Sequence, residues 1–120
     1  YTLALLTDGF LPGQRLKVQA LDIEHYFRQI VYTEELGRQF WKPSQVGFQK
    51  IVETLGIPAD RMAYVADNEG KDFIAPNQMG MLTIQVRRPR CLYAHAGDQP
   101  NAAAALRIDQ IEDLPSLLVR

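Results

Sequence analysis

The chain has 120 residues, of which 47% are hydrophobic and 22% are charged, and its formal net charge is -1. This balance is typical of a soluble globular protein and excludes a disordered segment. The charge supports neither nucleic-acid binding nor a membrane-surface role, and no apolar run approaches the ~20 residues of a membrane span. We expect one domain with a modest core over residues 1–120.

The first residue and the number of cysteines indicate the extent of the protein and its redox environment. The chain starts at Tyr1, inside an apolar segment, so we expect it to be a piece of something longer. The single cysteine, Cys91, rules out an internal disulfide and favours a reducing, cytoplasmic compartment. The one basic cluster comprises Arg87, Arg88 and Arg90. Such a cluster is more typical of a solvent-exposed surface than of a phosphate-binding site.

The first half of the chain predicts two strands and two helices. Tyr1–Leu6 is an apolar run ended by Thr7-Asp8-Gly9, which favours a buried parallel strand. Pro12–Leu21 opens with proline and is predicted as a helix. Gln29–Tyr32 is β-branched and aromatic and predicts a strand, after which Thr33 is expected to cap a helical turn.

The helix with the clearest pattern follows, at Ser44–Leu55. Its apolar stripe is Val46, Phe48, Ile51, Val52 and Leu55, and Gly56 ends it.

Strands and helices also alternate in the second half of the chain. We predict strands at Met62–Ala66, Met81–Val86 and Leu106–Ile108, and helices at Asp72–Gln78 and Asp113–Val119, the last packing Leu114, Leu117 and Leu118. Arg87–Ala104 has no clear period and is expected to be a long loop. Strands alternating with helices indicate an α/β fold with a mainly parallel sheet.

Two carboxylates frame the loop after the third predicted strand. The apolar run ends on Asp67, and Asp72 follows five residues later. Ligands of open α/β sheets bind at the carboxyl ends of the strands, and oxygen ligands suit a hard cation such as Mg²⁺. Two interpretations stay open, namely a magnesium site or a solvated loop in which Asp72 caps a helix.

Residues suited to phosphate chemistry follow the first two strands. Thr7 ends the first strand, and Lys42 lies beyond the second, just before Pro43. A lysine neutralises phosphoryl oxygens and a hydroxyl donates to them. Each residue alone is explained as well by a turn threonine or a surface lysine. A phosphorylation-receiver domain, which has a similar sheet, is disfavoured because its first-strand acid pair is not found.

These motifs together resemble the core domain of the haloacid dehalogenase-like (HAD) hydrolase superfamily. Leu5-Leu6-Thr7-Asp8-Gly9 is similar to the second motif of that family and Lys42-Pro43 to the third. Asp67 and Asp72 are similar to the fourth motif, with Ala66 where the family usually has glycine. The resemblance implies a Rossmann-like three-layer α/β/α core with a mainly parallel sheet.

The resemblance also implies an activity and a site. It implies a Mg²⁺-dependent phosphohydrolase acting on a small phosphorylated metabolite, with no nucleic-acid or membrane partner. Lys42 is implied as a catalytic residue, and phosphate binding falls to Thr7, Asp8 and Lys42. The implied metal ligands are Asp67 and Asp72.

The first motif of the family, Asp-x-Asp, is not found in the chain, and we expect it upstream of Tyr1. In the family it supplies the aspartate that becomes an aspartyl-phosphate and the general acid/base. Two functions therefore stay open: a hydrolase whose nucleophile lies outside this chain, or a non-catalytic binding or assembly module.

The strand that carries this motif lies, in the family, between the strands that here end at Thr7 and Asp67. An unfilled slot would expose unpaired backbone groups. An upstream segment, a second copy in a homodimer, or direct pairing of the two strands could close it, and we predict the first.

Overall fold

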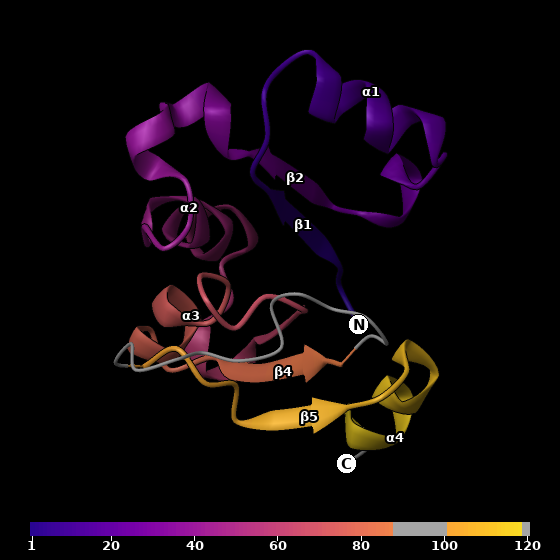
Figure 1. Ribbon diagram of the computed structural model, residues 1–120, viewed down its shortest axis with the longest axis vertical. Coiled ribbons are helices and arrows are strands. Elements are labelled where there is room, and N and C mark those ends of the chain that lie inside the picture. The colour runs from indigo at the N-terminus through magenta and orange to yellow at the C-terminus, as the bar shows by residue number, and fades with distance from the viewer. Residues whose placement is uncertain (88–100, 119–120) are drawn as a thin grey trace. The chain divides into compact units, whose positions relative to one another are not determined.

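The computed structural model describes residues 1–87 and 101–118, and the chain divides into two compact units, Tyr1–Ile57 and Pro58–Arg120 (Figure 1). All three recorded strand pairs are parallel, which confirms the predicted α/β fold. That residues 1–120 form one domain stays a prediction.

The first unit is built on two parallel strands. Strand β1 (Ala4–Thr7) pairs with β2 (Gln29–Tyr32), and Thr7 lies opposite Tyr32. Helix α1 (Gly13–Ala20) lies in the connection between them, since parallel strands need a long crossover. Both strands therefore end at the same edge of the sheet.

Helix α2 (Val46–Leu55) contacts both strands of this sheet. Phe48 and Ile51 are buried, so the predicted apolar stripe is confirmed as its inner face. A Cβ atom at Gly47 would lie 2.7 Å from Cδ1 of Leu6, so the glycine allows the close approach of helix to strand.

The second unit has three parallel strands in the order β3 (Ala63–Ala66), β4 (Leu82–Val86) and β5 (Leu106–Ile108). Helix α3 (Ile74–Gln78) lies between β3 and β4, and α4 (Leu114–Leu118) follows β5. Phe73 and Ile84 are buried in its core.

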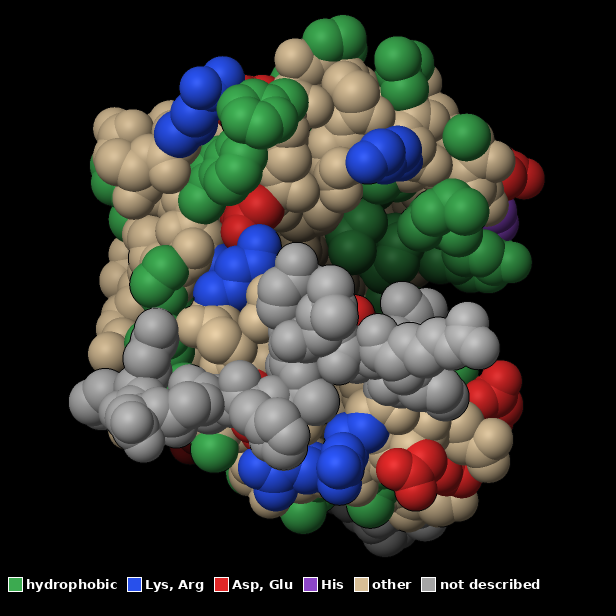
Figure 2. Space-filling model, viewed as in Figure 1, with side chains coloured by type: hydrophobic (Ala, Val, Ile, Leu, Met, Phe, Trp, Pro, Cys, Tyr) green, Lys and Arg blue, Asp and Glu red, His purple; other side chains and the backbone are tan. Residues whose placement is uncertain are grey.

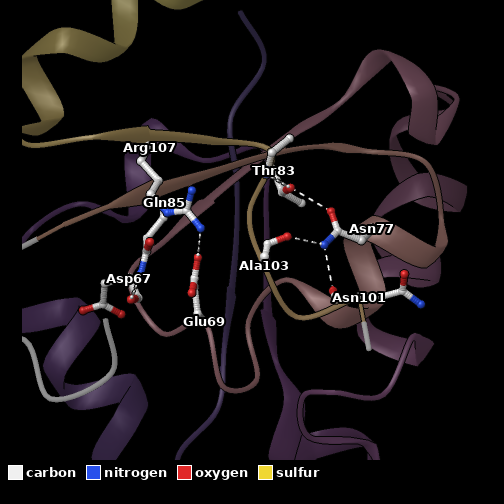
Figure 3. A network of polar contacts seen from close by, with 9 residues as sticks. Asp67, Glu69, Asn77, Thr83, Gln85, Asn101, Ala103 and Arg107 are labelled. Atoms are coloured by element: carbon white, nitrogen blue, oxygen red, sulfur yellow. Dashed lines mark hydrogen bonds and ion pairs between the residues drawn. The ribbon is translucent and has the colours of Figure 1, made fainter. Parts of the chain in front are cut away.

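Asn77 fixes the segment that leads into β5 (Figure 3). Its Nδ2 donates to the carbonyl oxygens of Asn101 at 2.7 Å and Ala103 at 2.8 Å, and its Oδ1 accepts from Thr83 Oγ1 at 2.7 Å. The backbone N–H of Ala105 in turn donates to Thr83 Oγ1 at 2.9 Å. The buried Thr83 hydroxyl thus holds β5 in place.

Strands β1 and β3 are edge strands of their sheets among the residues that the structure describes. Each has one recorded strand partner, β2 and β4 respectively. That a further strand lies beside either of them stays a prediction.

Several predicted boundaries need correction. The first strand is Ala4–Thr7 instead of Tyr1–Leu6, and the helix predicted to begin at Ser44 begins at Val46. The closing helix is the 3-10 turn Ile111–Asp113 followed by α4, and the predicted packing of Leu117 was wrong because that side chain is 40% exposed.

The predicted Thr33 cap is also wrong, and so is the open interpretation in which Asp72 caps a helix. The residue before the 3-10 helix Thr33–Leu36 is Tyr32, which makes no side-chain cap, and Phe73 holds that position before α3. The polar atoms of Thr33 and Asp72 bind loops instead, as described below. Polar side chains satisfy the nearest buried partner, which a sequence pattern does not reveal.

Predictions for Arg88, Arg90 and Cys91, and for most of the loop Arg87–Ala104, lie outside the described residues. Within the described part of the chain, no helix has both the length and the apolar character needed to cross a membrane.

Candidate functional site

Three predicted residues, Thr7, Asp8 and Lys42, form what we name the phosphate half-site, at the carboxyl end of β1. The Asp8 carboxylate brings them together, because its Oδ1 accepts a 3.3 Å hydrogen bond from the backbone N–H of Lys42. The same oxygen accepts from Thr33 Oγ1 at 2.6 Å. Thr33 reaches Asp8 because Thr7 and Tyr32, the residues that precede them, are register partners.

The hydroxyl of Thr7 is held by helix α1. Nε2 of Gln14 donates a 2.6 Å hydrogen bond to Thr7 Oγ1, and the Thr7 hydroxyl in turn donates to the carbonyl oxygen of Asp8 at 3.3 Å. To donate to a phosphoryl oxygen, the single hydroxyl hydrogen would have to turn away from this long contact with Asp8.

Glu34 fastens the loop that follows Asp8. Its carboxylate accepts a hydrogen bond from the backbone N–H of Leu11 and a 3.1 Å hydrogen bond from Nε of Arg38. The Leu11 hydrogen bond, followed by the effect of Arg38, lowers the pKa of Glu34 below its ordinary value, although partial burial opposes the shift. The loop is therefore held most firmly while Glu34 is ionised.

An aromatic group lies beside this loop. The rings of Phe10 and Trp41 meet edge to face at 5.3 Å, and the guanidinium of Arg38 lies 4.4 Å from the centre of the Phe10 ring. Phe10 and Trp41 are close in sequence to Asp8 and Lys42. The contacts hold the two chain segments of the phosphate half-site against each other.

The second set of predicted residues lies in the loop 67–72 between β3 and α3, which we name the metal loop. Asp72 is only 4% exposed, and its Oδ2 accepts a 3.0 Å hydrogen bond from the backbone N–H of Asn68. The backbone N–H of Asp72 donates to Asn68 O at 2.9 Å, and Asn68 Oδ1 accepts from Gly70 N at 2.9 Å. Asp72 therefore closes the loop on itself.

Asp67 is half-buried at the carboxyl end of β3. Its backbone carbonyl accepts a 3.1 Å hydrogen bond from Nε2 of Gln85 on the neighbouring strand. Asp67 also lines a cavity of ≈ 740 Å³ with Val86 and residues 109–112. This volume is in the range of small-molecule sites.

Glu69 is not among the site residues predicted from the sequence. It is 3% exposed, and its Oε1 lies 2.8 Å from NH2 of Arg107 on β5 (Figure 3). The contributions of Gln85 and Arg107 were also missed. A sequence signal did exist, since Gln85 and Arg107 are polar residues inside the short apolar strands β4 and β5. The sequence does not reveal, however, which residues their side chains contact.

The donor set of the metal loop fits a magnesium ion. Asp67 and Asp72 offer carboxylate oxygens, and Mg²⁺ binds proteins through one or two carboxylates while keeping several waters. Among residues 1–87 and 101–118 there is no group of three or more His, Cys, Asp or Glu side chains suited to a metal. The phosphate half-site belongs to the first unit and the metal loop to the second, and each is described within its own unit.

Comparison with known proteins points to one family. The family profile of the haloacid dehalogenase-like hydrolases matches residues 1–86. The chain is 33% identical over 88 residues to a glyceraldehyde 3-phosphate phosphatase of Methanopyrus kandleri, covering 73% of this chain and 37% of that protein. It is 27% identical to a phosphoserine phosphatase of Thermus thermophilus, covering 93% of this chain and 42% of that protein.

Solved structures share the fold. A HAD phosphatase from Thermococcus onnurineus matches 98% of this chain and 50% of its own, with a TM-score of 0.79 and 24% identity. The HAD-hydrolase YfnB from Bacillus subtilis, in a magnesium-bound form, matches all of this chain and 50% of its own, with a TM-score of 0.82 and 19% identity.

The chain thus spans less than half of these two curated relatives and half of these two solved chains. The family profile nevertheless covers 86 of its 120 residues, including every residue of the phosphate half-site and the metal loop. The chain belongs to the haloacid dehalogenase-like hydrolase family.

Proposed function

We propose that this chain supplies the phosphate-binding and metal-binding part of a Mg²⁺-dependent phosphohydrolase that cleaves phosphate monoesters of a small metabolite. The observation that carries the proposal is the metal loop, which Asp72 closes through Asn68 while Asp67 follows the end of β3. The phosphatases among its relatives support the same class of reaction.

Each residue has a defined role in this proposal. The ammonium of Lys42 neutralises phosphoryl oxygens, and the Thr7 hydroxyl donates to one of them. Asp8 contributes through its backbone N–H, because its carboxylate would repel phosphate and is already bonded to Thr33. Magnesium, when bound through Asp67 and Asp72, polarises the phosphoryl group.

The nucleophile belongs to the upstream Asp-x-Asp motif that the family resemblance implies. In this proposal its first aspartate attacks phosphorus and the alcohol leaves with a proton from the second aspartate. Water then hydrolyses the aspartyl-phosphate and releases phosphate. Thr7 and Lys42 hold the phosphoryl oxygens through both steps.

Apolar side chains on the surface of the first unit bear on its partners. Hydrophobic side chains are exposed on the first unit, over α1 and the loops beside it (Figure 2). They include Phe10, Leu16, Leu21 and Tyr26. We propose that an upstream segment or, failing that, a second copy of the chain in a homodimer covers these side chains, since large exposed apolar patches mark contacts with another segment or chain. A cytoplasmic location stays a prediction.

The test is Asp67→Asn in the protein as it is encoded, assayed for hydrolysis of an aryl phosphate with and without Mg²⁺. We expect Mg²⁺-dependent turnover in the wild type and a loss of about 10²-fold or more in the variant. Asp60→Asn is the matched control, because Asp60 is an exposed carboxylate near the opposite end of β3.

Turnover that survives Asp67→Asn, or that does not need Mg²⁺, would overturn the proposed metal role. A wild type with neither turnover nor Mg²⁺ binding would favour the alternative, a non-catalytic binding or assembly module.

A further inference from the structure

The metal loop contains a third carboxylate, Glu69, whose burial needs an explanation. A carboxylate that is 3% exposed is costly unless a positive group or hydrogen-bond donors compensate it. The compensating group is the guanidinium of Arg107, with NH2 at 2.8 Å from Oε1. The side chain of Arg107 is 44% exposed, so it keeps contact with water while its guanidinium binds the buried acid.

The strand register explains why Arg107 can reach the loop. Gln85 on β4 and Arg107 on β5 are register partners, and side chains paired in this way lie on the same face of a sheet. Gln85 donates to the carbonyl oxygen of Asp67, and Arg107 binds Glu69 (Figure 3). Two adjacent strands therefore hold the metal loop at two points, one at each side of Asn68.

The structure assigns Gln85, Glu69 and Arg107 to one device, which we name the loop clasp. We infer that the clasp positions the metal loop for Mg²⁺, so that a residue on β5, 40 positions away from Asp67 in the sequence, sets the metal affinity. This inference rests on the proposed function of the metal loop. Groups that orient metal ligands commonly affect metal affinity by about 10-fold to 100-fold.

The geometry makes Glu69 a positioning residue. Its Oε1 is bonded to Arg107, and the adjacent hydrogen bonds of Asn68 and Gly70 fix the backbone on both sides. Loss of Arg107 would leave a buried charge without this partner, and the cheapest relief is for Glu69 to move into water. That movement would displace the backbone between Asp67 and Asp72.

The experiment measures Mg²⁺ binding by calorimetry, without substrate, for the protein as it is encoded. The variants are Arg107→Ala, Glu69→Gln and the double variant, with Arg61→Ala as the matched control. Arg61 is an exposed arginine that precedes β3. Thermal unfolding with and without Mg²⁺ is recorded for each protein.

We expect Arg107→Ala to raise the Mg²⁺ dissociation constant by about 10-fold and Arg61→Ala to leave it within about 2-fold. Glu69→Gln should weaken binding less, since it leaves no buried charge. In that background the further loss of Arg107 should have little effect, because the two residues act as a pair. If Arg107→Ala does not fold, Arg107→Lys replaces it, with a smaller expected loss.

The experiment distinguishes failure of the proposed function from failure of the loop clasp. A wild type that binds no Mg²⁺ would overturn the proposed function itself. A wild type that binds Mg²⁺, together with clasp variants that bind it equally well but unfold at lower temperature, would overturn the clasp alone and leave Arg107 a purely structural residue.

Discussion

Thr33 Oγ1 donates a 2.6 Å hydrogen bond to Asp8 Oδ1, although the two residues are 25 positions apart. The same hydroxyl lies 3.2 Å from the carbonyl oxygen of Thr7. Thr33 is buried and Asp8 is half-buried, so this contact joins the ends of β1 and β2 in partial shelter from water. It holds the loop on which the phosphate half-site depends.

Thr33→Val should therefore destabilise the chain. Valine keeps the shape but removes the hydroxyl, and the half-buried Asp8 carboxylate loses one hydrogen bond while it keeps the one from the Lys42 N–H, which costs about 1 kcal/mol. The free energy of unfolding in urea measures the effect. Thr54→Val is the control, because the Thr54 hydroxyl accepts an exposed hydrogen bond from Nε2 of Gln29, and its loss should cost under about 0.5 kcal/mol. Equal losses in the two variants would contradict the role given to Thr33.

Gln14→Ala should weaken phosphate binding without weakening Mg²⁺ binding. The glutamine orients the Thr7 hydroxyl at 2.6 Å, and loss of one hydrogen bond of about 1 kcal/mol corresponds to roughly a 5-fold weaker inhibition by inorganic phosphate. Gln19→Ala, an exposed glutamine on the same helix, provides the control. A Gln14→Ala variant with unchanged phosphate inhibition would show that Thr7 needs no orientation by α1.

We expect Glu34 to stabilise the folded chain in a pH-dependent way. The pKa of Glu34 is lower in the folded chain than its ordinary value of 4.5, chiefly because the Leu11 N–H donates to it. The proton therefore binds better to the unfolded chain, so the contribution is present above pH 4.5 and is lost as the pH falls through the folded-state pKa.

Urea unfolding of Glu34→Gln between about pH 3 and pH 6 tests this sign. The variant should be less stable than the wild type at pH 6, and the difference should shrink toward pH 3. Glu53→Gln removes an exposed carboxylate from α2 and controls for the change in net charge. A stability difference that grows as the pH falls would contradict the assignment.

Two glycines should respond to alanine in opposite directions. Gly56 ends α2 with φ +65°, where a side chain costs about 1 kcal/mol or more. Gly13 lies in α1 with open space around its Cβ position, so alanine should stabilise the helix by about 0.5–1 kcal/mol. Thermal unfolding measures both, and a stabilising Gly56→Ala would contradict the cap.

Some parts of the site could be read from the sequence because they depend on local patterns. Asp67 follows an apolar strand, and Thr7 ends another, so their places at the carboxyl ends of β3 and β1 followed from strand prediction alone. The helix α2 was predicted from its apolar stripe and its terminal Gly56. The residues that form each of these elements are near neighbours in the chain, so short-range periodicity is sufficient to predict the element.

Long-range partners could not be read in this way. The sequence predicts Thr33 as a helix cap and leaves a cap open as one interpretation of Asp72, which is the common use of such residues, but each binds a loop instead. The competing partner for Thr33 comes from another strand, and its availability depends on the register of β1 with β2. A local preference worth about 1 kcal/mol is easily overridden by a buried contact.

Local patterns were enough to predict the α/β alternation, the order of the motifs and the residue types that fit phosphate and magnesium. The burial of Glu69 against Arg107 and the hydrogen bond from Gln85 to Asp67 became visible once the strands were paired. Strand register, which pairs Gln85 with Arg107, arises from packing of the whole sheet. The side chains that meet across such a register are far apart in the chain, and no local pattern encodes their contact.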